Sequence, residues 1–194
     1  MLPNLIGISG ALNSGKDSVA KIMLELLWEK DRLPIWKIKK FAEYLKDMCL
    51  GLCQVPDFEH REYKNRLCDE WGMTGREVLQ TVGSLFRDHF DKDVWVKLLF
   101  RGFYPDDEYC KWIISDLRYA NEFDAIKSRG GICIRVDRPN LPEDLSHTSE
   151  TEWRNLTFDY AISNDGTLDD LREKVKEMIT YYELKDNWVK DLHR

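Results

Sequence analysis

The stretch from Gly10 to Lys16 constrains the fold of this chain more than any other feature, because it has the spacing G-x-x-x-x-G-K. The apolar run 5–9 before it predicts a buried strand, and apolar residues at helical spacing over 15–30 predict a helix after it. A loop of this spacing between a strand and a helix is typical of a phosphate-binding loop, or P-loop. Its glycines let the backbone curl round an anion, and the helix N-terminus adds partial positive charge. The alternative is a chance Gly-Lys turn before a helix.

A P-loop lysine reaches the β- and γ-phosphates of a nucleotide and offsets the charge that spreads during phosphoryl transfer. We therefore expect Lys16 to act directly in transfer of a phosphate from ATP. The residues of this segment expected to bind ATP are Gly10, Ala11, Asn13, Ser14, Gly15, Lys16, Asp17 and Ser18.

The residue after the lysine is Asp17, where a P-loop usually has Ser or Thr to hold Mg²⁺, and Ser18 follows one position later. Mg²⁺ favours hard oxygen ligands, so the Asp17 carboxylate can hold the ion directly or through water. A second carboxylate, Asp116, ends the apolar run 112–115. We expect Asp17, Ser18 and Asp116 to bind Mg²⁺.

Two charged residues follow Asp116 closely. Arg118 is expected to clamp a phosphate, and with Lys16 and Asp116 it completes the predicted catalytic set. Glu122 lies four residues further on, at the start of a predicted helix over 120–129. The alternatives are a helix N-cap at Asp116 and a surface i,i+4 pair between Arg118 and Glu122.

Strand and helix patterns alternate along the chain, which predicts βαβ units and a parallel sheet in a single domain. Further strands are predicted over 35–41, 132–136 and 160–162, and a last helix over 168–184. The charged segments 41–52 and 59–71 look helical. The stretch 42–104 is too long for a simple crossover, so it predicts a helical region that covers the substrate.

A helix is predicted to start at Thr74, with Glu77 at the spacing of a capping box. Its arginines, Arg76 and Arg87, are expected to meet the phosphate of an acceptor. Gly83 costs about 1 kcal/mol against alanine inside a helix, which close approach of a ligand would justify. Trp95 is expected to stack on a base. The alternatives are a charged helix with a packed glycine and a tryptophan in the core.

The polar loop 138–153 contains two prolines, acidic residues and the sequence His147 to Glu150, and we expect it to form a small lid over the phosphates. A plain surface loop is the alternative. The turn 164–167 precedes the last helix, and Asn164 either lies against the adenine of ATP or belongs to a simple turn and cap.

The net charge of −6 argues against a nucleic-acid scaffold. The five cysteines are odd in number and contain no Cys-x-x-Cys pair, which favours idle thiols in a reducing cytosol. No apolar run approaches the roughly 20 residues of a membrane span, and the N-terminus lacks the pattern of a signal peptide. A cytoplasmic protein without membrane or nucleic-acid partners is expected.

Taken in order, several segments resemble the deoxynucleoside monophosphate kinases of tailed phages, and they span nearly the whole chain. These segments are 10–18 with Gly-Lys-Asp-Ser, 41–46, 79–83 with 95–97, 115–118 with 121–122, 147–150, and 163–167. An Asp after the P-loop lysine is usual in that family.

The resemblance implies an adenylate-kinase-like P-loop NTPase fold, with a parallel five-stranded sheet flanked by helices, a helical NMP-binding region and a small lid. It implies transfer of the γ-phosphate of ATP to a deoxynucleoside monophosphate, giving a dNDP and ADP. On this basis Lys16, Asp17 and Ser18 would handle ATP and Mg²⁺, and Arg138 would be a lid arginine that binds ATP. The acceptor residues would be Arg76, Gln80, Gly83, Ser84, Trp95, Arg118 and Glu122, together with Arg87 and with Glu150 of the 147–150 segment. Members of the family often act as homodimers, and a phage-encoded member would work in the host cytoplasm.

Two other functions are compatible with the P-loop. One is a kinase of another small phosphorylated acceptor, such as phosphomevalonate or dephospho-coenzyme A. The other is a regulatory module that binds ATP without an acceptor, which would lack a second set of phosphate-clamping arginines.

Overall fold

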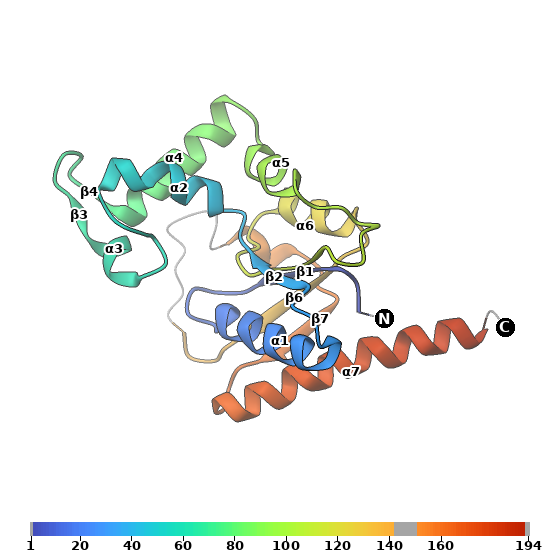
Figure 1. The fold of residues 1–194 in the computed structure, drawn as a ribbon. Helices are drawn as coiled ribbons and strands as arrows, with labels where there is room; N and C mark the ends of the chain where they lie inside the picture. Colours follow the sequence, from blue (N-terminus) through green and yellow to red (C-terminus); the bar gives the residue numbers. More distant parts are fainter. Residues whose placement is uncertain (1, 142–150, 193–194) are drawn as a thin grey trace. The chain divides into compact units, whose positions relative to one another are not determined.

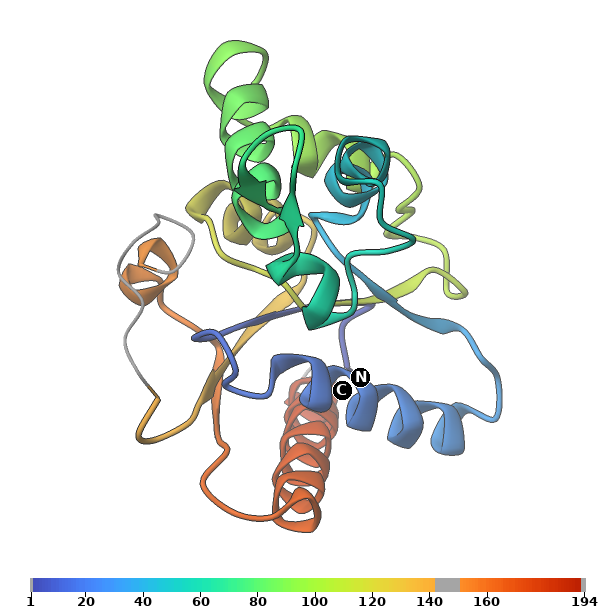
Figure 2. The ribbon, with the colours of Figure 1, turned by 90° about the vertical axis from the view of Figure 1, so that its left-hand side faces the viewer.

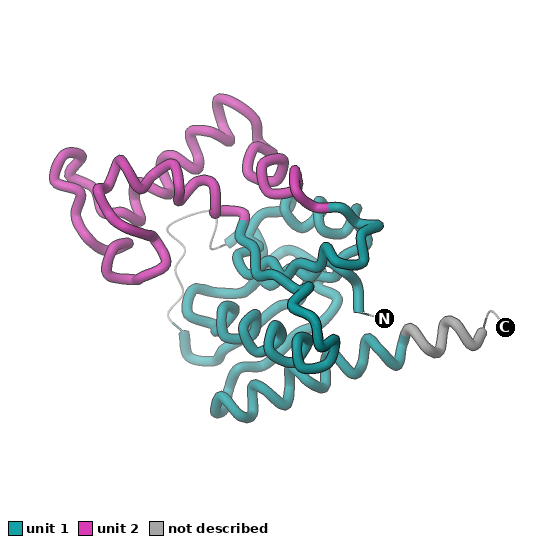
Figure 3. The backbone as a smooth tube through the Cα atoms, viewed as in Figure 1, with its two compact units in different colours: residues 1–40, 104–194 teal, residues 41–103 magenta. Residues whose placement is uncertain are grey.

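The computed structural model describes residues 2–141 and 151–192, with side chains up to residue 185. The chain divides into two compact units (Figure 3): unit 1 contains residues 1–40 and 104–194, and unit 2 contains residues 41–103. Within the described ranges, no helix is both long enough and apolar enough to cross a membrane.

Unit 1, in which Figure 1 labels strands β1, β2, β6 and β7, is built on a parallel sheet. The sheet has five strands in the order β2-β5-β1-β6-β7. The strands are β1 (Leu5–Ser9), β2 (Trp36–Lys39), β5 (Lys111–Ile114), β6 (Ile132–Asp137) and β7 (Tyr160–Ser163). The central strand, β1, pairs with β5 on one side and β6 on the other, and all of its residues are buried. The parallel sheet and the strands predicted at these five positions are therefore confirmed.

Helices cover both faces of this sheet (Figure 2). On one face, α1 (Lys16–Asp31) and α7 (Leu168–Leu192) pack against Ile6 and Ile8 in one apolar cluster. On the other face lies α6 (Ala120–Lys127), whose Ile126 would come within 2.5 Å of a Cβ atom at Gly7. A residue without a side chain at position 7 thus lets α6 approach the central strand. A short 3₁₀ helix, η2 (Glu152–Asn155), precedes β7.

Unit 2 is mainly helical and has its own core. It contains α2 (Glu43–Cys53), α3 (Arg61–Asn65), α4 (Gly75–His89) and α5 (Val94–Phe100), with a hairpin of β3 (Leu67–Cys68) and β4 (Met73–Thr74). Buried apolar residues of α2, α4 and α5, such as Leu45, Val78 and Trp95, form one cluster with Phe58 and Cys68.

The prediction of a helix over 59–71 is wrong beyond Asn65. The backbone becomes extended at Arg66, and Gly72 turns the chain with a φ of +62°. Cys68 is buried in the core of unit 2, and the carbonyl of Arg66 accepts a hydrogen bond from the N–H of Gly75. Tertiary burial overrides the helical preference of a charged segment here.

The start of α4 is a capping box, as predicted. The Thr74 hydroxyl accepts the N–H of Glu77 at 3.3 Å, and the Glu77 carboxylate accepts the N–H of Thr74 at 2.7 Å. Each contact satisfies a backbone donor that the first turn of a helix leaves without an intrahelical partner.

Replacing Thr74 by alanine removes one of these caps, so we expect Thr74→Ala to lower the free energy of unfolding by about 1 kcal/mol. For a chain of this size the melting temperature should fall by about 2–4 °C, measured by circular dichroism. Thr81→Ala is the matched control, because Thr81 is exposed in the interior of the same helix. There alanine has the better helix propensity, so the control should melt at the same or a higher temperature. Equal losses in both variants would contradict the capping role.

Candidate active site

The P-loop connects β1 to α1 through three residues with positive φ: Gly10 at +142°, Asn13 at +64° and Gly15 at +101°. A Cβ atom at Gly10 would lie 2.4 Å from the carbonyl oxygen of Val136, and one at Gly15 would lie 2.3 Å from the side chain of Asn164. Both glycines are therefore required by backbone conformation and by close packing. The loop curls as the sequence predicts, with the N–H of Ser14 donating to the carbonyl of Ala11.

Lys16 lies inside this curl. Its ammonium group donates to the carbonyl oxygens of Gly10 at 2.7 Å and Ala11 at 2.6 Å, and the residue is 9% exposed. The hydroxyl of Ser14 is buried and makes no hydrogen bond to any residue that the structure describes. A buried polar group without a partner costs about 1–3 kcal/mol. A phosphate oxygen is a chemically suitable partner for a hydroxyl in this loop.

Residues from the ends of β6 and β7 brace the loop. The side-chain amide of Asn164 donates to the carbonyl of Ser14 at 2.8 Å, and its backbone N–H donates to the carbonyl of Asp137. The guanidinium of Arg138 lies 3.5 Å from the carbonyl of Asn13, at the outer limit of a hydrogen bond. Asn164 thus contacts the loop itself, and its contact with adenine stays a prediction. The cap of α7 is Thr167, whose hydroxyl accepts the N–H of Asp170.

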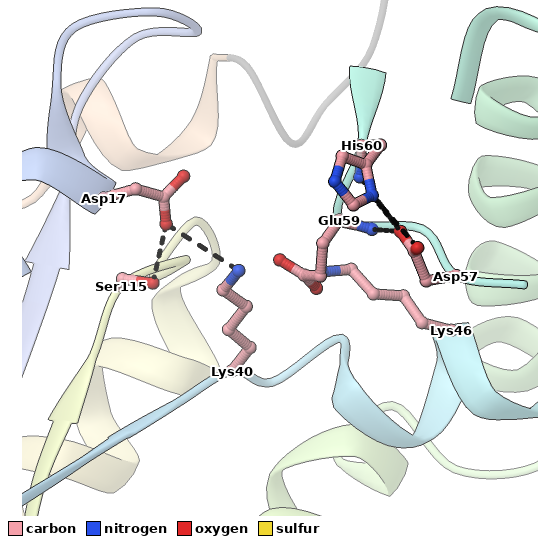
Figure 4. A network of polar contacts seen from close by, with 7 residues as sticks. All are labelled: Asp17, Lys40, Lys46, Asp57, Glu59, His60 and Ser115. Carbon is pink, nitrogen blue, oxygen red and sulfur yellow. Dashed lines mark hydrogen bonds and ion pairs between the residues drawn. The ribbon is translucent and has the colours of Figure 1, made fainter. Parts of the chain in front are cut away.

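Two of the described residues of unit 1, Ser115 and Lys40, contact the side chain of Asp17 (Figure 4). The hydroxyl of Ser115 donates to Asp17 Oδ1 at 3.1 Å, and the ammonium of Lys40 lies 3.8 Å from the same oxygen. Ser18 is the next residue of α1 and is half-buried. Among the described residues, no group of three or more His, Cys, Asp or Glu side chains is suited to hold a metal ion. This is compatible with Mg²⁺, which proteins often hold by one or two carboxylates while waters and substrate phosphates complete the shell.

The segment 115–118 is fixed beside the P-loop strand. The N–H of Leu117 donates to the carbonyl of Ile8, and the buried hydroxyl of Ser9 donates to the carbonyl of Leu117 at 2.7 Å. Asp116 and Arg118 flank this anchored residue, at the carboxyl edge of the sheet. Asp116 does not cap α6, whose N-cap residue is Tyr119, so that alternative is wrong.

Glu122 is buried and accepts the backbone N–H groups of Arg118 at 2.8 Å and Tyr119 at 3.1 Å. Its carboxylate therefore holds the start of α6 and the end of the 115–118 segment together. Contact between Glu122 and an acceptor stays a prediction.

In unit 2, the predicted acceptor residues of α4 share one face of the helix, because they recur at helical spacing. These residues are Arg76, Gln80, Gly83, Ser84 and Arg87. All but Gly83 are half-buried. The guanidinium of Arg87 leans back along the helix, within 3.6 Å of where a Cβ atom of Gly83 would lie. Two arginines thus lie on a partly exposed helical face.

The core explains Gly83 and Trp95. A Cβ atom at Gly83 would lie 3.0 Å from a methyl group of Leu45 in α2, so the glycine permits close helix packing. The indole N–H of Trp95 donates to the carbonyl of Gly83 at 3.2 Å, its ring packs on Phe86, and the residue is 3% exposed. The structure therefore supports the core alternative for Trp95, and stacking on a base stays a prediction.

Sequence reasoning passed over several polar contacts. In unit 1 these are the contacts of Ser115 and Lys40 with Asp17. In unit 2 they are an ion pair between Lys46 and Glu59 and a turn in which Asp57 accepts the N–H groups of Glu59 and His60 (Figure 4). The hydrogen bond from the backbone of His60 is the main reason that the pKa of Asp57 is lowered. The sequence feature that could have pointed to the contact of Ser115 is its position at the end of a predicted strand, close to the P-loop. The predicted residues His147 and Glu150 lie outside the described residues.

All five cysteines are free thiols, and all but Cys110 are buried. Burial raises the pKa of Cys49 to about 11 and the pKa values of Cys53 and Cys133 to about 12. These three thiols therefore stay protonated near neutral pH and are poor nucleophiles.

Together the fold and the loop define a P-loop nucleotide-binding protein. The sequence model of the deoxynucleotide monophosphate kinase family matches residues 35–175. A protein of Acanthamoeba polyphaga mimivirus, provisionally named as such a kinase, is 33% identical over 187 residues, covering 88% of this chain and 93% of that protein. The deoxynucleotide monophosphate kinase of Enterobacteria phage T4 is 30% identical over 118 residues, covering 59% of this chain but 48% of the phage protein. The chain belongs to the deoxynucleotide monophosphate kinase family.

A solved structure, dephospho-CoA kinase from Campylobacter jejuni, matches 95% of this chain and 100% of its own, with a TM-score of 0.51 and 11% identity. At this identity the likeness concerns the fold alone. It agrees with the P-loop kinase fold that the sequence predicts.

We expect Asn164→Ala to lower the free energy of unfolding by about 0.5–1.5 kcal/mol, because the carbonyl of Ser14 loses its side-chain partner. Urea titration measures the effect. Asn155→Ala is the matched control, since Asn155 is exposed in η2 of the same unit. If the two variants are equally stable, Asn164 does not brace the P-loop.

Proposed function

We propose that this chain transfers the γ-phosphate of ATP to a deoxynucleoside monophosphate, giving a dNDP and ADP. The observation that carries the proposal is the P-loop with Lys16 inside it, next to the buried hydroxyl of Ser14, which has no hydrogen-bond partner among the described residues. Membership of the deoxynucleotide monophosphate kinase family supports the choice of acceptor.

On the donor side, backbone N–H groups of residues 10–16 would bind the phosphates of ATP, with the partial positive charge at the start of α1. Lys16 would exchange its carbonyl partners for phosphate oxygens and offset the negative charge that spreads during transfer. Arg138 follows β6 and its side chain is near the carbonyl of Asn13, so it is suited to reach the same phosphates. Asn164 would act by holding the carbonyl of Ser14 in place.

Asp17, Ser18 and Asp116 are the residues that would hold Mg²⁺, whose positive charge would offset the negative charge of the phosphates. Asp17 and Ser18 belong to the first turn of α1, and Asp116 follows the neighbouring strand β5. Arg118 would bind either the phosphoryl group during its transfer or the phosphate of the acceptor, because a guanidinium can donate hydrogen bonds to two phosphate oxygens at once.

On the acceptor side, the α4 face with Arg76, Gln80, Ser84 and Arg87 is the proposed binding surface for the dNMP. Phosphoryl transfer depends on positioning and electrostatics rather than on a strong base. Arginines on this face that position the acceptor phosphate would therefore be enough for its role in transfer, without a catalytic base. The lid role of 138–153, including Glu150, belongs to the same proposal.

ATP and a dNMP are the small-molecule partners in this proposal, and the cytoplasm is the compartment that supplies both. A homodimer is a further expectation from the family resemblance, which light scattering tests directly.

Two alternatives remain in the design of the test: a kinase of another phosphorylated acceptor, and a module that binds ATP without an acceptor. An assay of ADP release with Mg·ATP should give turnover with one or more of dGMP, dTMP, dAMP, dCMP and hydroxymethyl-dCMP, and little with phosphomevalonate, dephospho-coenzyme A or no acceptor. The matching ribonucleotides define sugar preference.

Lys16→Ala should lower kcat by about 10²- to 10³-fold. Turnover with a non-nucleotide alone would overturn the acceptor assignment, and unchanged turnover in Lys16→Ala would overturn the P-loop assignment.

We expect Arg76→Gln to raise the KM for the best dNMP by about 10- to 100-fold, because a hydrogen bond to a charged phosphate is lost. ATP affinity, measured separately by calorimetry, should stay within twofold of wild type. Arg61→Gln makes the same change at an exposed position of α3 and should leave both quantities unchanged. An unaltered KM in Arg76→Gln would remove this residue from the acceptor site.

A further inference from the structure

Asp17 carries a carboxylate where a P-loop usually carries a hydroxyl, and the structure shows what surrounds that carboxylate. We propose that Ser115 is a positioning residue for the metal-binding carboxylate of Asp17, and that Lys40 is a cation that competes with the metal for it. This inference rests on the proposed function, because it concerns how Mg·ATP is held.

The side chain of Asp17 is 72% exposed, so the described part of the chain leaves most of it open to solvent. An exposed side chain samples several rotamers and loses that freedom when it binds a metal. The hydroxyl of Ser115 donates to Oδ1 at 3.1 Å, and Oδ2 points away from Ser115 and Lys40 (Figure 4). A carboxylate fixed through one oxygen presents its second oxygen in a defined direction.

Ser115 is suited to this task because it is itself rigid. The residue is 2% exposed and directly follows β5. Its backbone N–H donates to the carbonyl of Lys39 at 3.2 Å, which continues the ladder between β5 and β2. The sheet thus fixes the backbone from which the Ser115 hydroxyl projects, while the carboxylate that this hydroxyl contacts belongs to α1. A buried hydroxyl needs a partner, and Asp17 supplies one from another element.

Lys40 reaches the same oxygen from the end of β2. Lys39 pairs with Ile114 in the sheet, so Lys40 and Ser115 leave neighbouring strands at the same level. The ammonium of Lys40 lies 3.8 Å from Asp17 Oδ1. A cation at this distance balances the carboxylate, but it also repels a divalent ion that shares the carboxylate. The two neighbours of Asp17 therefore have opposite expected effects on metal binding.

The test measures the affinity of the non-hydrolysable analogue AMPPNP by calorimetry, once with Mg²⁺ and once with EDTA. The ratio of the two affinities reports how much the metal contributes, separately from turnover. Ser115→Ala should lower this ratio by about 3- to 10-fold, the effect of one lost hydrogen bond. Lys40→Gln should raise it by about 2- to 3-fold, an effect that weakens with added salt. Lys37→Gln is the matched control, because Lys37 is exposed on the same strand, and it should leave the ratio unchanged.

A double-mutant cycle separates positioning from a general structural role. In an Asp17→Ser background, which restores the usual P-loop residue, Ser115→Ala should no longer change the ratio. If Ser115→Ala lowers the ratio equally in both backgrounds, Ser115 does not act through Asp17 and the inference is overturned. If Lys40→Gln lowers the ratio of the two AMPPNP affinities, Lys40 does not compete with the metal and that part of the inference is overturned. Circular dichroism of each variant confirms that it is folded.

Wild-type protein distinguishes failure of the inference from failure of the proposed function. If it binds AMPPNP equally with Mg²⁺ and with EDTA and turns over no acceptor, the proposed function fails. If its binding depends on Mg²⁺ and Ser115→Ala behaves as wild type, the inference alone fails.

Discussion

The burial of β1 along its whole length determines the rest of unit 1. A buried strand has no water to satisfy its backbone, so it must pair on both edges, here with β5 and β6. Parallel pairing places the carboxyl ends of all three strands at one edge of the sheet. The P-loop, the 115–118 segment and the 137–138 segment therefore leave the sheet side by side, although they are far apart in sequence. The hydrogen bonds of Leu117 with Ile8 and Ser9 then lock two of them together.

The buried polar residues that the structure describes lie near the carboxyl edge of the sheet. Within the ranges that the structure describes, the buried polar and charged residues are Ser9, Ser14, Lys16, Ser115 and Glu122. All five belong to unit 1, and they lie in the P-loop, at the ends of β1 and β5 or at the start of α6. Burying a polar group costs free energy unless it is hydrogen-bonded, and four of the five have protein partners. Ser14 is the exception. Its hydroxyl has no partner in the part of the chain that the structure describes, which is compatible with a loop that binds an anion.

The sequence was sufficient for features that depend on local pattern. The G-x-x-x-x-G-K spacing, the strand periodicity and the capping box at Thr74 each involve residues within a few positions of one another, and all three are found. Features that depend on tertiary contacts were missed. The hairpin after Asn65 forms because Cys68 is buried in the core, which local charge does not reveal. For Gly83 and Trp95 the sequence left ligand contact and core packing open, and contacts in the core of unit 2 account for both residues. Glu122 had the spacing of a surface pair, whereas its carboxylate is buried against backbone N–H groups.

Asp17 shows why such contacts matter for the chemistry of the site. A hydroxyl at this position is neutral and short, so it needs neither a counter-charge nor a residue to orient it. A carboxylate brings a full negative charge and a freely rotating group, which places two new demands on its surroundings. Here the strands next to the loop meet both demands, with a hydroxyl from the end of β5 and an ammonium from the end of β2. The replacement of a hydroxyl by a carboxylate on α1 is thus accompanied by a hydroxyl on the neighbouring strand. In the proposed site, the 115–118 segment would therefore contribute to metal binding through Ser115 as well as through Asp116.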